Sequence, residues 1–129
     1  MKMLFYFEEI IIMFLQLNHY QFDVYKITRA FVKECYFLTK VFPAEEKFAI
    51  AQQIRRAALS VHLNLSEGFS RKSENERKRF FEISRGSIIE IDAALDIAQD
   101  LGYCQKDKLT ELGLCMTRSF SMLSKLISH

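Results

Sequence analysis

Eight basic residues in the middle of the chain are the side chains best suited to binding a ligand. Guanidinium and ammonium groups bind phosphate oxygens through charge-assisted hydrogen bonds, so a cluster of them indicates contact with a nucleic-acid backbone. The set comprises Arg55, Arg56, Arg71, Lys72, Arg77, Lys78, Arg79 and Arg85. Acidic residues prevail in the next stretch, 86–112, so the net charge of +2 conceals an uneven distribution. This asymmetry predicts a basic patch, and two solvated helix faces are the alternative.

The spacing of the arginines suggests how they gather. If 44–67 and 73–101 form an antiparallel helical hairpin that turns near residue 70, Arg56 and Arg85 both lie ~21 Å from the turn at ~1.5 Å per residue. We therefore expect Arg55, Arg56 and Arg85 to form one basic cluster, with the remaining cations forming a second cluster at the turn. Alternatively, Arg55 and Arg56 pair with nearby glutamates or with the acids of another subunit.

Several small and polar residues indicate close helix contacts near this turn. Asn64 and Glu67 lie one helical turn apart, which predicts a hydrogen-bonded turn with Ser60, Ser70 or Arg71. Gly68 is expected to cap the end of its helix. Small residues at Ser84, Gly86 and Ser87 predict the close approach of a neighbouring helix. Glu67 has no paired carboxylate and no nucleophile beside it in the sequence, which disfavours a catalytic role.

The sequence favours neither a metal site nor an enzyme. The three cysteines, Cys35, Cys104 and Cys115, have no zinc-ligand spacing and are expected to be buried free thiols. No Glu-x-x-His pair and no glycine-rich phosphate loop occur. We therefore expect no metal, no cofactor and no catalytic residue. A remote alternative is a metal-independent RNase, because Arg55 and Arg56 precede His62 at a spacing that resembles the loose Arg–His signature of helical HEPN-type RNases.

The composition and the periodicity predict an all-α fold. One proline and four glycines among 129 residues favour long helices. Apolar residues at spacings of three and four predict helices over 20–41, 44–67, 73–101 and 106–128. Pro43 separates the first two helices, a capping box at Ser73 and Glu76 begins the third, and Gly102 ends it. Short connections then favour an up-down-up-down antiparallel four-helix bundle over residues 19–129.

The expected inward side chains follow these periodicities. They are Val24, Ile27, Phe31, Cys35 and Leu38 in the first helix; Phe48, Ala51, Ile54, Ala58, Val61 and Leu65 in the second; Phe80, Ser84, Ser87, Ile91, Ala94 or Leu95, Ala98 and Leu101 in the third; and Leu109, Leu112, Met116, Phe120, Leu123 and Ile127 in the fourth. A second apolar stripe in the first helix, at Tyr25, Val32 and Tyr36, requires a cover.

Residues 1–18 form an apolar segment that precedes the bundle. Glu8 and Glu9 interrupt it, and the charge-free part is shorter than the ~20 residues that span a bilayer, so no membrane anchor is expected. We expect this segment, or a second subunit, to cover the second stripe of the first helix. A true start at Met13 is the alternative.

Several motifs in order resemble one protein family. They are FPAEE at 42–46, QIRRAALSV at 53–61, NLSEG at 64–68, RFFEISRGS at 79–87, EI at 90–91 and LGY at 101–103. Together they resemble the four-helix-bundle family also called 23S rRNA intervening-sequence proteins. Many members have proline where this chain has His62, so the helix kink expected there is in doubt.

The resemblance implies a small cytoplasmic bacterial protein that forms a homo-oligomer, commonly a pentameric ring. Some members are encoded inside intervening sequences of the large ribosomal RNA, and a related branch assists reverse transcriptases and binds nucleic acid. The leading hypothesis is therefore a non-enzymatic, oligomeric protein that binds RNA or DNA or acts as an adaptor. The alternative is a bundle that only contacts proteins, with its arginines serving subunit contacts.

Overall fold

The chain folds as an all-α bundle, which confirms the predicted fold class. A computed structural model describes residues 15–129, and the predictions for residues 1–14 lie outside that part. The long helices are α2 (Asp23–Thr39), α3 (Ile50–Ser70), α4 (Glu74–Asp100) and α5 (Thr110–Ser128). Short 3-10 helices precede three of them: η1 (Asn18–Gln21), η2 (Ala44–Glu46) and η3 (Lys106–Leu109). Leu15 and Leu17, the described apolar residues of the N-terminal segment, are exposed.

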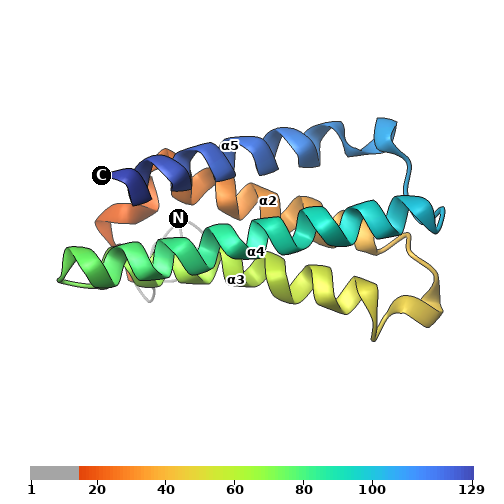
Figure 1. Cartoon of the computed structure of the whole chain (residues 1–129), viewed down its shortest axis with the longest axis horizontal. Helices are drawn as coiled ribbons and strands as arrows, with labels where there is room; N and C mark the ends of the chain where they lie inside the picture. Colours follow the sequence, from red (N-terminus) through yellow and green to blue (C-terminus); the bar gives the residue numbers. More distant parts are fainter. Residues whose placement is uncertain (1–14) are drawn as a thin grey trace, which may run out of the picture.

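The helices lie side by side with their connections alternating between the two ends of the bundle (Figure 1). The turn from α3 to α4 and the C-terminus lie at one end, which we call the turn end. The connections α2–α3 and α4–α5 lie at the other end, which we call the loop end. The core runs between the helices and includes Phe31, Ile54, Leu65, Ile91 and Leu123, all fully buried.

Local capping signals fix both ends of α4 as predicted. The Ser73 hydroxyl accepts a hydrogen bond from the Glu76 amide at 3.1 Å and so caps the first turn. At the other end Gly102 has φ +77°, which a glycine adopts without strain. The Tyr103 amide then bonds the Ala98 carbonyl, and the Gly102 amide bonds the Gln99 carbonyl, as in a Schellman motif.

The boundaries of α3 differ from the prediction. The helix begins at Ile50 rather than residue 44, because η2 and a short turn follow Pro43. Phe48, expected in the core, is consequently 79% exposed. The helix also continues through Gly68, which is buried and not a C-cap. A Cβ at Gly68 would lie 2.6 Å from Phe81 Cε1, so this glycine allows α4 to approach closely.

The inward face of α4 also differs in part. Phe81 and Ile88 are buried where Phe80 and Ser87 were expected, which moves the stripe by one residue at those points. The prediction for Gly86 was wrong, since Gly86 is exposed and a Cβ there would meet nothing within 4 Å. Ser84 does permit close approach, because its hydroxyl donates to the Val61 carbonyl at 2.5 Å.

A further expectation about an apolar face was wrong, on α5, and the second stripe of α2 has contacts within the bundle. On α5, Ser119 is buried whereas Phe120 is 38% exposed, because apolar residues on both sides of this helix make its period ambiguous. On α2, Tyr25 and Val32 pack against the core, and Tyr36 lies beneath an α3 arginine. Two residues of this second stripe therefore contact α3 of the same chain, Tyr25 through His62 and Tyr36 through Arg55.

Candidate nucleic-acid interface

Two serine hydrogen bonds fix how α3 and α4 align. Ser84 bonds the Val61 carbonyl, and the Ser87 hydroxyl donates to Ser60 Oγ at 2.8 Å. Arg85 therefore lies level with Ser60 and Val61, about one helical turn (~5.4 Å) nearer the turn than Arg56. The expected pairing was displaced because α3 runs beyond Gly68 and moves the turn.

Arg85 also points away from the other two arginines. Its Nη1 donates to Ser124 Oγ of α5 at 3.1 Å, and its guanidinium lies 5.7 Å from the Phe120 ring centroid. Arg55 Nε instead donates to Thr39 Oγ1 of α2 at 2.8 Å. The predicted cluster of Arg55, Arg56 and Arg85 is thus wrong. Arg55 and Arg85 tie α3 and α4 to different neighbours, whereas Arg56 is exposed.

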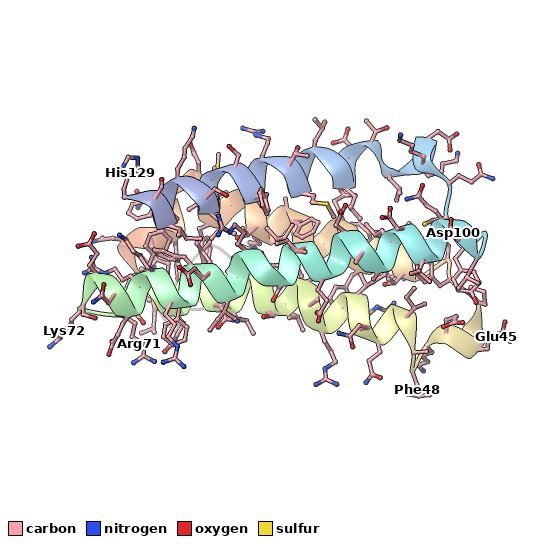
Figure 2. All side chains as sticks on the ribbon, viewed as in Figure 1. Glu45, Phe48, Arg71, Lys72, Asp100 and His129 are labelled. Atoms are coloured by element: carbon pink, nitrogen blue, oxygen red, sulfur yellow. The ribbon has the colours of Figure 1, made fainter. Side chains whose placement is uncertain are left out.

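The five cations expected at the turn do gather there. Arg71 Nη2 pairs with Glu67 Oε1 at 2.5 Å and its guanidinium lies over the Phe80 ring. Arg77 closes the turn, because its Nε donates to the Arg71 carbonyl at 2.7 Å and its Nη2 donates to the Lys72 carbonyl at 3.2 Å. Figure 2 shows Lys72 projecting from this end of the bundle.

Most of these positive charges have no acidic partner. In the part of the chain that the structure describes, only Arg71 and Lys78 of the eight cations form ion pairs, the latter with Glu74 at 3.5 Å. Bonds from Arg55, Arg77 and Arg85 to hydroxyl or carbonyl oxygens leave their charges uncompensated. Lys72 and Arg79 are exposed, so they and Arg77 give the turn a net positive character.

The end of α5 adds a cation that the sequence analysis missed. Lys125 lies in its last turn and lines an open hollow of about 420 Å³ beside Phe22, Phe69 and Met122. A neighbouring hollow of about 330 Å³ is lined by Arg77, Lys78 and other residues of the same end. Lys125 is distant from the basic stretch in sequence, and only its place in the bundle could have revealed it.

The polar residues before the turn form the expected hydrogen bonds. Asn64 Nδ2 donates to both the carbonyl and the hydroxyl oxygen of Ser60, each at 2.9 Å. The Ser70 hydroxyl donates to the Glu67 carbonyl at 2.6 Å. Since Ser60 also accepts from Ser87, these side chains join α3 to α4. They serve the packing of the hairpin and leave Glu67 engaged with Arg71.

Two imidazoles, His19 buried and His62 half-buried, hold η1 and α2 against α3. His62 Nδ1 lies 2.9 Å from Thr28 Oγ1, and its ring packs on Tyr25. His19 Nε2 lies 2.8 Å from Ser66 Oγ, and its ring stacks on Phe69. Burial lowers the pKa of both histidines, and nearby positive charge adds to the effect at His62.

Neither of the two arginines that precede His62 in the loose RNase-like spacing contacts its ring through a hydrogen bond within residues 15–129. Arg55 binds Thr39 and Arg56 is exposed, so neither is bonded to the histidine.

Burial raises the pKa of Cys35 to about 12, which leaves its thiol protonated and unreactive. Among residues 15–129 no group of three or more His, Cys, Asp or Glu side chains could hold a metal ion. No helix in the same part of the chain has the length and apolar character that crossing a membrane requires.

Comparison with known proteins assigns the chain to a family. The family described as 23S rRNA-intervening sequence protein matches residues 20–125. The chain belongs to this family. A crystal structure of a protein of unknown function from the S23 ribosomal protein family of Bacteroides thetaiotaomicron VPI-5482 has a similar fold, with a TM-score of 0.75 at 20% identity. The match covers 82% of this chain and 99% of that one. A comparison with curated proteins gave no match.

Two of the sequence motifs of this 23S rRNA-intervening sequence protein meet at its loop end. The Tyr103 hydroxyl donates to Glu46 Oε1 at 2.6 Å, and its ring packs against Phe42. Glu46 Oε2 also accepts a long hydrogen bond of 3.4 Å from the Ile50 amide at the start of α3. The FPAEE and LGY segments therefore join the two connections at this end of the bundle.

Proposed function

We propose that this 23S rRNA-intervening sequence protein is a homo-oligomeric, non-enzymatic protein of the bacterial cytoplasm that binds RNA or DNA, or acts as an adaptor on it. The observation that carries the proposal is the group of uncompensated cations at the α3–α4 turn. Lys72 and Arg79 are exposed there, and Arg77 is fixed by the turn carbonyls. Phosphate oxygens are the ligands that such groups favour.

Contacts of this kind position a nucleic acid without reading its sequence. Phosphate contacts carry no base information, so little sequence preference is expected. A few cations per subunit give weak binding alone, since each released counterion contributes modestly. Several copies in one oligomer, pentameric if the family resemblance extends to assembly, would raise the overall affinity by avidity.

A filter-binding assay across a salt series tests the proposal. The charge-reversed variant K72E/R79E should bind RNA and DNA at least about tenfold more weakly at low salt, because phosphate contacts dominate such affinities. K33E/R118E is the matched control, since it alters two exposed cations on α2 and α5 and changes the net charge equally. Equal losses in both variants, or no binding by the wild type at low salt, would contradict the proposal.

A second candidate is a bundle that contacts only proteins. Exposed apolar side chains on α3 and α4, including Leu63 at 60% and Ile89 at 56%, favour this candidate. In that case the wild type would form the oligomer but bind neither RNA nor DNA, and charge reversal at Arg55 and Arg56 would act on assembly alone. The same filter-binding assay, combined with size-exclusion chromatography, separates the two candidates.

A further inference from the structure

An exposed apolar ridge runs along the outer side of the α3–α4 hairpin. It consists of Leu59 and Leu63 of α3 and Ile83 of α4, which we call the α3–α4 ridge. The bond between Ser60 and Ser87 fixes its geometry. Leu63 lies one turn after Ser60 and Ile83 one turn before Ser87, so antiparallel packing brings Leu63 and Ile83 to the same level. Such a contiguous ridge loses water favourably when a partner covers it.

A groove follows the other flank of α4, between α4 and α5. It consists of two adjoining hollows of about 330 and 580 Å³ that share Asp92, Met116 and Thr117. We call it the α4–α5 groove. Its apolar lining residues are Ile88, Ile89, Leu95, Leu109, Leu112, Leu114, Met116 and Phe120. Ile89 and Leu114 are more than half exposed, so the isolated subunit leaves apolar surface in contact with water here.

Charged residues of opposite sign lie beside the two surfaces. Asp92 and Asp96 line the groove and form no ion pair within residues 15–129, although Lys106 lies at one end. On α3, Arg56 lies about one helical turn before Leu59, the first residue of the ridge. Arg56 is also exposed and forms no ion pair within residues 15–129. Opposite charges beside two apolar surfaces favour one orientation of docking.

We propose that the α3–α4 ridge of one copy docks in the α4–α5 groove of a second copy, with Arg56 facing Asp92 or Asp96. The proposal rests on the self-association included in the proposed function and identifies the surfaces that achieve it. Ridge and groove lie on opposite flanks of α4, so the contact is head-to-tail. Each added copy leaves a free ridge and a free groove, and assembly ends only when a ring closes.

Mixing two blocked variants tests this arrangement. Leu63→Asp places a charge on the ridge, and Ile89→Asp places one in the groove. Size-exclusion chromatography with light scattering should show an oligomer for the wild type and a monomer for each variant alone. An equimolar mixture should give a heterodimer and nothing larger, because only one intact ridge and one intact groove remain. Phe37→Asp, at an α2 position exposed to a similar degree (58%), should assemble like the wild type.

The pair of Arg56 and Asp92 provides a second test that leaves the apolar side chains unchanged. Arg56→Glu should weaken assembly, and the double variant R56E/D92R should restore it. Circular dichroism of each variant verifies that the bundle remains folded. A mixture that stays monomeric, or single variants that assemble like the wild type, would overturn the ridge-and-groove contact alone. A monomeric wild type would also overturn the proposed self-association.

Discussion

Gly68 and Gly86 lie on facing helices in opposite packing environments. Gly68 is buried against the Phe81 ring, whereas Gly86 is exposed with open space where a Cβ would stand. Gly68→Ala should destabilise the protein by about 1–3 kcal/mol, because the added methyl group displaces Phe81. Gly86→Ala should stabilise it by up to about 1 kcal/mol, because alanine favours the helix. Urea unfolding at one fixed protein concentration measures both effects.

The two substitutions are controls for each other, since each adds one methyl group to a helix. Changes of the same sign would show that helix propensity alone decides, and that the close contact at Gly68 is unimportant. A destabilising Gly86→Ala would point to a neighbouring subunit at that position, because nothing within the described chain surrounds it.

His19 and His62, which are wholly or partly buried, predict a pH dependence of stability. Burial lowers the pKa of His19 and His62 in the folded protein below the ordinary value of 6.5. The unfolded chain therefore binds more protons as the pH falls through 6.5, and the free energy of unfolding should decrease. Above pH 6.5 the neutral histidines allow full stability, and below pH 6.5 the free energy of unfolding decreases progressively.

Urea unfolding at several pH values between about 5.5 and 7.5 tests this, in a window above most carboxylate titration. In the double variant H19N/H62N the pH dependence should become nearly flat. His129 is exposed and serves as the control, because His129→Asn should leave the dependence unchanged. An equally steep dependence in the double variant would contradict the assignment.

At the scale of the elements, one hydrogen bond joins the two connections at the loop end. The Tyr103 hydroxyl donates to Glu46, and this bond raises the pKa of Tyr103. Tyr103→Phe should lower the urea midpoint, because Glu46 loses a donor that joins η2 to the α4–α5 connection. Tyr20→Phe is the matched control, since the Tyr20 hydroxyl makes no hydrogen bond to any of residues 15–129. Equal midpoints for the two variants would show that this bond adds nothing to stability.

Local signals in the sequence predicted the helices well, and contacts between helices were harder to predict. Pro43, the Ser73–Glu76 cap and Gly102 each act on neighbouring residues, so their effects can be read from the chain. Gly68 could not be interpreted in this way. A glycine near the end of a helix looks the same whether it caps the helix or admits Phe81 from the next one.

The same distinction applies to the candidate site. The cations of the turn are close in sequence, and the structure gathers them there. The partners of Arg55 and Arg85 are Thr39 and Ser124, which only tertiary packing brings near. A small displacement of the turn was enough to separate Arg56 from Arg85, because neighbours across an antiparallel hairpin depend directly on where it turns.

At the scale of the whole molecule, the charges separate between two surfaces. The turn end holds exposed Lys72 and Arg79 together with Lys125, whereas Asp92 and Asp96 line the α4–α5 groove. Under the proposed function, the acidic groove would repel a nucleic acid and the turn would attract it. The proposed ridge-and-groove contact would cover the acidic surface and leave the turns of all copies accessible, so assembly and nucleic-acid binding would not compete.

This separation predicts how salt affects binding. Each phosphate contact contributes about 0.9 to the slope of log K against log salt for duplex DNA and about 0.7 for a single strand. Loss of the Lys72 and Arg79 contacts should therefore lower the slope by about 1.8 per subunit engaged on duplex DNA and by about 1.4 on a single strand, whereas K33E/R118E should leave it unchanged. The variant Leu63→Asp, monomeric if the ridge docks as proposed, should retain the slope of one subunit and lose the avidity of the oligomer. An unchanged slope in K72E/R79E would show that the turn does not contact phosphate, whatever the affinity of the wild type.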